Sequence, residues 1–448
     1  MPSRIITFFI VCGILLLSPL ILREEIYAKE ITPLQDLQHL IQNAKPGETL
    51  HIPPGDYKGP ILIDKPLQLE AAIGNVHIFN DSNEPAIQLK ADHTRMNGIE
   101  IVDSIHKDES AAIVILGDYN TLDHLTVQTK STGIQLRNAN HNTIQNTSIA
   151  WLEEREDRPA KVSEKGNGID LWESHQNKIL GNQLSNLHDG IYMEKSNLNQ
   201  IDRNQIVHSR YGIHCMYTDD IIVENNDGSY NVTGMMIMGA KNSRITGNTF
   251  YKQSENVNSQ GLLLYDVQSS LIERNRLEGN RVGMYVEQSQ NNELIHNVIS
   301  QNFVGLQLKN TQKNTSKGNE FYANVIQAEA VDSQGNKLEG NYWDGFRGID
   351  LTDTGHSSIT YGINPFFQKL TEEVPAYQLF FQSPGLPFLE SMFTTKQESW
   401  TKDLSPLMKP ALVSGESLQS QSYITLWFGL VLMILPIITI YYLGVKRV

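Results

Sequence analysis

The chain has 448 residues, of which 40% are hydrophobic, 19% charged and 8% aromatic. This composition excludes a disordered, collagen-like or polytopic membrane protein and leaves enough apolar material for a large core. The net charge of −14 argues against nucleic acid as a partner and favours a cationic one. Cys12 and Cys215 are the only cysteines. Because Cys12 lies in a predicted leader, the mature chain has no internal disulfide.

The N-terminal segment has the pattern of a secretory signal peptide over residues 1–28. Arg4 carries the positive charge, residues 5–22 are apolar, and a cleavage site of small residues precedes Lys29. Leu37, Leu40 and Ile41 then follow at helical spacing. We predict an N-terminal cap over residues 29–60 that covers the open strand edges of the repeats after it.

Glycine followed by alternating apolar residues recurs along the middle of the chain. The spacings are 35, 22, 22, 22, 27, 22 and 22 residues in the series Gly133, Gly168, Gly190, Gly212, Gly234, Gly261, Gly283 and Gly305. Alternation over short runs is the period of a β-strand, and a repeat of this length is typical of a parallel β-helix. We predict an all-β fold, a right-handed parallel β-helix with coils of about 22 residues, over residues 61–345.

Asparagine follows the same register. Of the 37 asparagines, 30 lie between residues 138 and 341. One series consists of Asn182, Asn204, Asn226, Asn248, Asn275, Asn297 and Asn319. Stacked at one bend, these amides would hydrogen-bond along a ladder and tolerate left-handed backbone conformations. We interpret them as structural.

Two insertions interrupt the repeat, one around residues 153–165 and one around residues 251–260. Both lie between the asparagine bend and the next glycine, so they should project from the same side of the solenoid. Insertions on one face of a repeat array often mark its binding face.

Between the insertions, strand alternation points the second and fourth residues after each glycine outward. These positions hold His214, Met216, Met236 and Met238, and Tyr192 and Glu194 occupy them one coil earlier. Methionine normally fills cores, so an outward His/Met cluster is unusual. Thioether and imidazole ligands suit Cu(I), and the cluster is therefore a candidate transient copper site.

Two other interpretations of the cluster remain open. One is an adaptable methionine-rich surface that holds a partner protein, with Trp172, Tyr192 and Glu194 contributing to it. The other is an apolar patch covered by the insertions. Cys215 points inward by the same alternation, which predicts a core thiol, although its neighbours His214 and Met216 leave a metal role open.

A polysaccharide lyase or epimerase is the alternative from another functional class. Its candidate residues are Asp170, Asp189 and the pair Asp219 and Asp220. No acid/base pair flanking a groove is evident. Trp172 and Tyr192 alone represent the aromatic row that a sugar groove needs. Asp344, Asp350 and Asp353 resemble a degraded calcium loop with altered spacing.

The C-terminal part begins with an extension and stalk over residues 346–422. Residues 423–443 carry no charge and are long enough to cross a bilayer as a helix. Lys446 and Arg447 follow, so residues 444–448 should form a cytoplasmic tail. Leader and anchor together predict an exported protein tethered to the extracytoplasmic face of the cell membrane.

Several segments of the chain together resemble the NosD family. They are RYGIHCMY at residues 210–217, NVTGMMIMG at 231–239, GNYWD at 340–344, RGID at 347–350, QSP at 382–384 and SPLMKP at 405–410. The resemblance extends from about residue 30 to 410. It differs in one respect, since many NosD-like proteins are soluble in the periplasm, whereas this chain ends in a predicted membrane anchor.

The resemblance implies an accessory role without enzymatic activity and without a resident cofactor. NosD-like proteins work with an ABC transporter, built from an ATPase and a membrane permease, and with a copper-carrying lipoprotein. Together these proteins support assembly of the copper centres of nitrous oxide reductase. A cell without an outer membrane would need a tether to keep such a protein beside its transporter.

Overall fold

The computed structural model describes residues 36–153, 160–253, 256, 258–374, 376–377, 385–393, 400–411 and 434. The chain divides into two units, Met1–Leu34 and Gln35–Val448, and the fold below is that of the second unit. The predicted signal peptide over residues 1–28 lies outside the described residues.

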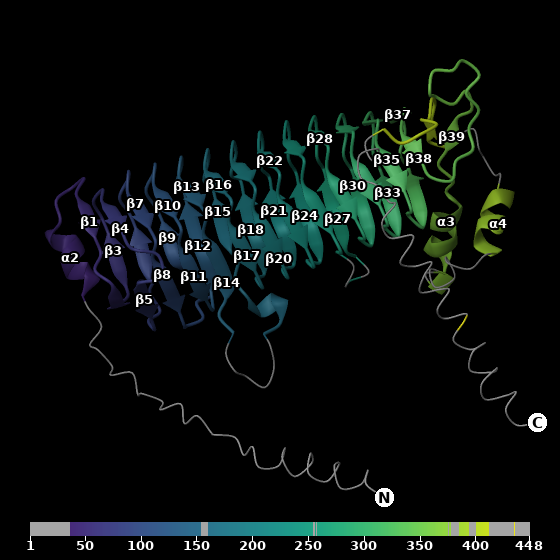
Figure 1. The fold of residues 1–448 in the computed structure, drawn as a ribbon. Coiled ribbons are helices and arrows are strands. Elements are labelled where there is room, and N and C mark those ends of the chain that lie inside the picture. The colour runs from purple at the N-terminus through teal and green to yellow at the C-terminus, as the bar shows by residue number, and fades with distance from the viewer. Residues whose placement is uncertain are drawn as a thin grey trace, which may run out of the picture. The chain divides into compact units, whose positions relative to one another are not determined.

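Three sheets form the walls of a solenoid (Figure 1), and each coil contributes one strand to each sheet in turn. The sheet that we call sheet A has 13 strands: β2 (Gly55–Lys58), β5 (Val76–Asn80), β8 (Glu100–Asp103), β11 (Thr126–Thr129), β14 (Ser148–Trp151), β17 (Gln183–Ser185), β20 (Gln205–Val207), β23 (Asp227–Ser229), β26 (Thr249–Tyr251), β29 (Arg276–Glu278), β32 (Val298–Ser300), β35 (Glu320–Tyr322) and β38 (Tyr342–Trp343).

Sheet B has 15 strands: β1 (Thr49–His51), β4 (Gln68–Glu70), β7 (Arg95–Asn97), β10 (Thr121–Asp123), β13 (Thr143–Gln145), β16 (Lys178–Leu180), β19 (Gln200–Asp202), β22 (Ile222–Glu224), β25 (Arg244–Thr246), β28 (Leu271–Glu273), β31 (Glu293–Ile295), β34 (Thr315–Lys317), β37 (Lys337–Glu339), β40 (Lys402–Asp403) and β39 (Tyr361–Gly362). Its pairs are parallel except β39 with β40.

Sheet C has 12 strands: β3 (Ile61–Ile63), β6 (Ile87–Leu89), β9 (Ala111–Ile115), β12 (Thr132–Arg137), β15 (Ile169–Trp172), β18 (Asp189–Glu194), β21 (Tyr211–Met216), β24 (Thr233–Met238), β27 (Gln260–Tyr265), β30 (Val282–Glu287), β33 (Val304–Lys309) and β36 (Ile326–Val331). The described helices are α2 (Leu37–Asn43), η1 (Val162–Glu164), α3 (Phe366–Glu373) and α4 (Gly385–Met392). The predicted parallel arrangement of short strands is confirmed.

The core fills the inside of the coils. The inward residues of all three sheets form one hydrophobic cluster that begins at Leu37 and ends at Ile363. Equivalent residues stack directly, as in the series Ile191, Ile213 and Met235, whose strands pair in that register. Because a single coil cannot bury its inner face alone, this stacking between neighbours holds the solenoid together.

The asparagine ladder forms as the spacing predicts. In each coil the backbone N–H of one ladder asparagine donates to Oδ1 of the next, for example Asn204 to Asn226 at 2.9 Å and Asn226 to Asn248 at 3.0 Å. The side-chain amide also donates to a backbone carbonyl, as Asn204 does to Ile179 at 2.9 Å. The ladder therefore satisfies buried polar groups at this bend in successive coils.

The expected left-handed conformation does not fall on the ladder asparagines themselves. It falls on the residue immediately before them, such as Arg203 with φ 55° and Asn225 with φ 55°. The preceding residue turns the chain, and the asparagine then points inward, where its amide spans two coils.

The β-helix begins earlier than the expected residue 61. β1 and β2 already pair in parallel with β4 and β5, so the first coil starts at Thr49, within the segment assigned to the cap. The helical part of the cap is α2, which Asp36 caps by accepting from the N–H of His39 at 3.0 Å. Gln38 pairs with the backbone of Leu62 through both its amide atoms, so α2 satisfies edge groups of β3.

Part of the C-terminal extension folds back on the last coils. β40 pairs with β37, and Leu407 bridges Tyr342, so residues 400–411 contact the end of the solenoid instead of continuing away from it as a stalk. α3 packs on the outer face of sheet C, where Phe367 joins Val282, Val304 and Ile326 in a second hydrophobic cluster.

Within the part of the chain that the structure describes, no helix is long and apolar enough to cross a membrane. The predicted membrane helix over residues 423–443 lies outside that part except for Ile434. The remainder of the predicted stalk, residues 412–422, and the predicted cytoplasmic tail, residues 444–448, lie outside it as well.

Candidate metal-binding and docking face

The outer face of sheet C carries the predicted His/Met cluster, which consists of His214, Met216, Met236 and Met238. β21 and β24 pair so that His214 lies opposite Met236 and Met216 lies opposite Met238. Neighbouring parallel strands are about 4.8 Å apart, so the four side chains are adjacent on this face. Their predicted juxtaposition is confirmed.

Strand alternation places the four residues as the sequence predicts. Ile213, Cys215 and Ile237 are fully buried in the core, whereas the three methionines of the cluster are half-buried on the outside. His214 differs from them, since it faces outward yet is only 6% exposed because other side chains of the outer face cover it. The interpretation as an apolar patch covered by the insertions stays a prediction, because parts of both insertions lie outside the described residues.

Three glycines give this face its shape. A Cβ added to Gly190, Gly212 or Gly234 would lie 2.4–2.6 Å from atoms of the core or of the next strand, so only glycine fits there. The strand register skips these glycines, since Asp189 pairs with Tyr211 and the next pair is Ile191 with Ile213. As a result Asp189, just before the glycine, reaches the same outer face as His214.

Asp189 is the centre of a buried polar network that spans two coils. Its Oδ2 lies 2.8 Å from His214 Nδ1, and its carboxylate accepts from Arg210 Nε at 2.9 Å and Nη2 at 2.7 Å. The Tyr211 N–H donates to it at 3.3 Å. Burial by itself would raise the pKa of Asp189, but the hydrogen bonds from His214 and Arg210 hold that pKa below its usual range.

The second ring nitrogen of His214 has no hydrogen-bond partner. Nε2 is buried, and no donor or acceptor lies within reach of it. The rings of Tyr192 and Tyr211 contact the imidazole edge to face, with centroids 5.1 and 4.8 Å away. Buried polar atoms are normally paired, so the unpaired Nε2 is an exception on this face.

The residues predicted to bind a partner line the neighbouring coil. The Tyr192 hydroxyl donates to Glu194 Oε2 at 2.9 Å and lies 3.6 Å from Met216 Sδ. Burial and the adjacent Glu194 carboxylate raise the pKa of Tyr192, so its phenol stays neutral. Trp172 pairs with Glu194 across β15 and β18, and the Lys195 amine lies over the Trp172 ring. The structure thus brings Trp172, Tyr192 and Glu194 beside the cluster.

The two insertions occupy the same corner, as predicted. One connects β14 to β15 and the other connects β26 to β27, so each lies between sheet A and sheet C. Residues 154–159 of the first and residues 254, 255 and 257 of the second lie outside the described residues. Lys165 in the first insertion contacts Asn186 and is nearly covered, and burial lowers the pKa of its amine.

Cys215 does not belong to the cluster. It is fully buried in the core on the opposite side of β21 from His214, and burial raises the pKa of its thiol. The prediction of a core thiol is confirmed.

The aspartates considered for other chemistry have structural partners. Asp170 accepts from Arg137 at 2.6 Å and from Asn167 at 2.8 Å, and Asp219 accepts from the backbone N–H of Lys241. Asp350 accepts from backbone N–H groups of Thr352, Thr354 and Gly355. Within the described ranges, no group of three or more His, Cys, Asp or Glu side chains could hold a metal ion. Asp344, Asp350 and Asp353 thus do not form such a group.

The pairing of Asp189 with His214 is the feature that the sequence analysis missed. Strict alternation from Ile191 would point Asp189 inward, and the skipped glycine reverses that assignment. The available signal was the charged residue directly before a repeat glycine, since an unpaired carboxylate is not stable in a core.

The stacked coils, the inward glycines and the paired sheets define a β-helix protein, and comparison with known families agrees. Residues 70–227 match the model described as right handed beta helix region, which confirms the predicted handedness. Residues 153–348 match the NosD model, described as periplasmic copper-binding protein (NosD). Together the two matches support a right-handed β-helix protein of the NosD family. Comparison with curated proteins gives no match.

Several solved structures are similar to this chain at low sequence identity. The A-module of the Azotobacter vinelandii mannuronan C-5 epimerase AlgE4 is 16% identical, with 69% of this chain and 91% of that chain covered and a TM-score of 0.47. The family 28 exopolygalacturonase of Yersinia enterocolitica is 11% identical, with 68% and 74% covered and a TM-score of 0.47. Tailspike protein 3 of bacteriophage CBA120 is 12% identical, with 66% and 53% covered and a TM-score of 0.48. None of these likenesses carries an argument about activity.

Proposed function

We propose that this chain is an exported, membrane-tethered accessory protein without enzymatic activity that supports copper-centre assembly in nitrous oxide reductase. Its partners would be an ABC transporter, formed by permease and ATPase subunits, and a copper-carrying lipoprotein or the apo-reductase. Copper is cargo in this proposal, held transiently as Cu(I). The description of the NosD family as periplasmic and copper-binding supports both the location and the cargo.

The observation that carries the proposal is the set of donor atoms on one face of the solenoid. His214 lies opposite Met236, and Met216 lies opposite Met238, on adjacent strands. Thioether sulfur and imidazole nitrogen are soft and borderline ligands that select Cu(I), whereas Ca²⁺ and Mg²⁺ need oxygen ligands. The half-buried methionines can also adapt their shape to a partner surface.

The docking part of the proposal assigns Trp172, Tyr192 and Glu194 to the rim of the copper site. Each of them lies on β15 or β18, one or two coils from His214. Aromatic side chains supply large contact areas in protein interfaces, and Glu194 would attract a cationic partner. A partner seated there would cover the methionines and shield bound Cu(I) from solvent.

The test replaces Met216, Met236 and Met238 together with leucine. Leucine preserves volume and apolar character, so the fold should be retained while three sulfur ligands are lost. We expect Cu(I) affinity, measured by competition with a chromogenic chelator, to fall at least about tenfold, equivalent to about 1.4 kcal/mol. Copper content and activity of the reductase in cells should fall in parallel.

Met392→Leu serves as the matched control because Met392 is exposed on α4 and does not belong to the cluster. It should leave both measurements unchanged. Unchanged Cu(I) affinity and unchanged reductase activation in the triple variant would contradict the proposal. Deleting the whole protein without loss of reductase copper would instead favour a purely structural surface protein.

The polysaccharide lyase or epimerase remains the second candidate. One observation favours it, namely that the His214 ring contacts two tyrosine rings and has an unpaired Nε2, a set of groups that could remove and return a proton. That nitrogen has no exposed surface, so a polymer would have to displace its cover. Turnover of any member of a panel of uronate polymers, abolished in His214→Ala, would replace our proposal with this one.

A further inference from the structure

The proton positions in the Asp189 network follow from its hydrogen bonds. Arg210 and the N–H of Tyr211 donate to the Asp189 carboxylate, which is therefore ionised and only accepts hydrogen bonds. His214 Nδ1, 2.8 Å from Oδ2, must then carry a proton. The tautomer of the imidazole is thus set by a neighbouring coil.

The protonation state of His214 Nε2 follows from that of Nδ1. A proton on both nitrogens would leave a charged N–H buried without an acceptor, which is costly. With Nδ1 protonated, the neutral ring leaves a lone pair on Nε2. The two nitrogens of an imidazole face in widely different directions, so Nε2 points away from Asp189. Met236 lies on the next strand, opposite His214.

We propose that Asp189, itself held by Arg210, is a positioning residue that locks His214 in the Nδ1–H tautomer and presents Nε2 as the nitrogen ligand for Cu(I). This inference rests on the proposed function. A carboxylate that hydrogen-bonds the far nitrogen of a ligand histidine orients the ring and increases its basicity. Asp189 is not itself a copper ligand, since both of its oxygens are occupied.

Arg210 has a defined part in this arrangement. Arg210 Nε and Nη2 each donate to one oxygen of Asp189, and this bidentate geometry fixes the plane of the carboxylate and stabilises its charge. The Arg210 guanidinium also lies over the ring of Tyr211, 4.4 Å from its centroid. The carboxylate therefore cannot rotate away from His214.

The discriminating variant is Asp189→Asn, which conserves shape. The amide oxygen would take the Oδ1 position, where it accepts from Arg210 Nε and from the Tyr211 N–H. The amide NH₂ would then take the Oδ2 position and donate to His214 Nδ1, and the hydrogen bond from Arg210 Nη2 would be lost. The ring would then adopt the Nε2–H tautomer and lose its free lone pair. Nitrogen-15 NMR of histidine-labelled protein, recorded at rising pH until the signals stop changing, distinguishes the two tautomers directly. His214→Ala identifies the signal.

We expect the Nδ1–H tautomer in the wild type and in Arg210→Gln, which keeps the Asp189 carboxylate, and the Nε2–H tautomer in Asp189→Asn. The Arg210 variant also controls for loss of a buried ion pair as such. Cu(I) affinity should fall about 10- to 100-fold in Asp189→Asn. A wild-type Nε2–H tautomer, or unchanged tautomer or affinity in Asp189→Asn, would overturn the inference.

Failure of the proposed function gives a different result. If the wild type did not bind Cu(I), the copper role would be wrong, yet the NMR measurement would still decide whether Asp189 sets the tautomer of His214. If the wild type binds Cu(I) and the triple methionine variant does not, while Asp189→Asn binds normally, only the positioning role is wrong.

Discussion

On strand β21, two successive residues lie in opposite environments, and this difference sets their chemistry. Cys215 is packed in the core, where burial raises the pKa of its thiol. His214 faces the other way and is fixed by Asp189. Reactivity of a cysteine depends on its thiolate form, so Cys215 is inert while His214 offers a ligand atom.

Cys215 should therefore resist alkylation in the folded protein. With its pKa raised, the thiol remains protonated at neutral pH, and the surrounding core blocks the reagent. We expect iodoacetamide to leave Cys215 unmodified in native protein over a time in which the chain in denaturant is fully labelled. Peptide mass spectrometry reads this residue separately from Cys12. Equal labelling in both states would mean that β21 faces the opposite way.

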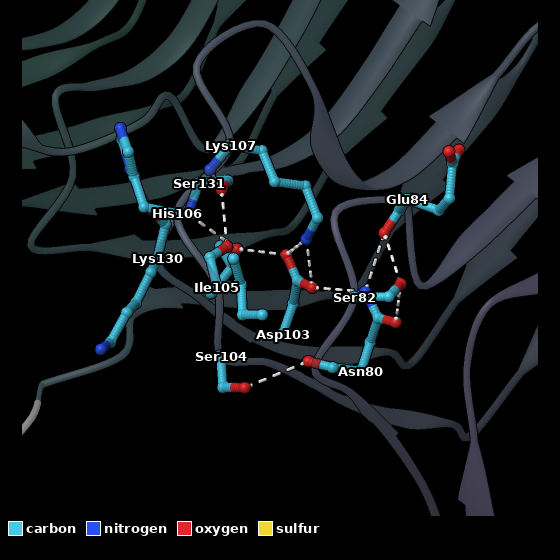
Figure 2. A network of polar contacts seen from close by, with 11 residues as sticks. Asn80, Ser82, Glu84, Asp103, Ser104, Ile105, His106, Lys107, Lys130 and Ser131 are labelled. Carbon is cyan, nitrogen blue, oxygen red and sulfur yellow. Dashed lines mark hydrogen bonds and ion pairs between the residues drawn. The ribbon is translucent and has the colours of Figure 1, made fainter.

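At the scale of one element, the connection between β8 and β9 is held by a buried ion pair. Figure 2 shows Lys107 reaching back to Asp103, whose side chain is fully buried. Asp103 also accepts from Asn80 Nδ2 at 2.8 Å and from Thr129 Oγ1 at 3.2 Å. One carboxylate thus joins three consecutive coils and closes the loop over residues 104–110.

Removing one partner of this pair should be costly. Asp103→Ala leaves the Lys107 ammonium buried without compensation, which we expect to destabilise the surrounding coils by about 3–5 kcal/mol. Hydrogen exchange measures this loss locally, as is needed because long repeat arrays do not unfold in two states.

The double replacement Asp103→Leu with Lys107→Met is the matched control. It removes both charges together, so the coils should lose clearly less stability than they do in Asp103→Ala. If both variants lost the same stability, the uncompensated charge of Lys107 would not be what destabilises Asp103→Ala.

At the scale of the whole molecule, the asparagine ladder needs an end. Asn341 is the last asparagine of the ladder, and Asp403, 62 residues further along, accepts its backbone N–H at 3.0 Å. The same carboxylate accepts the side-chain amide of Asn341 and the indole N–H of Trp343. Asp403, remote in sequence, thus supplies the acceptor for the last donors of the ladder, which have no further coil to bind.

Asp403→Ala should loosen this end of the solenoid. It leaves buried donors without acceptors, each costing about 1–3 kcal/mol. Because coils contact only their neighbours, we expect faster amide hydrogen exchange in residues 315–345 and no change in residues 121–145. Asn336→Ala, at the half-buried end of a second asparagine row, should have a smaller effect, since water can reach that site. Uniform loss of protection along the chain would contradict this model.

The sequence by itself determined the repeat, the register and the side of the sheet on which the residues after each repeat glycine lie. A period of 22 residues needs no long-range information, and alternation then places His214 and the three methionines outward. That information was enough to bring the cluster together, because residues one repeat apart must stack.

The tertiary structure alone decided how His214 is held and how the solenoid ends. The bulge at Gly190 turns Asp189 outward against a partner 25 residues away, and no local pattern specifies that reversal. The return of Asp403 to Asn341 depends equally on a contact across 62 residues. Local periodicity specifies which residues stack, whereas backbone irregularities and chain reversals become visible only when the coils are assembled.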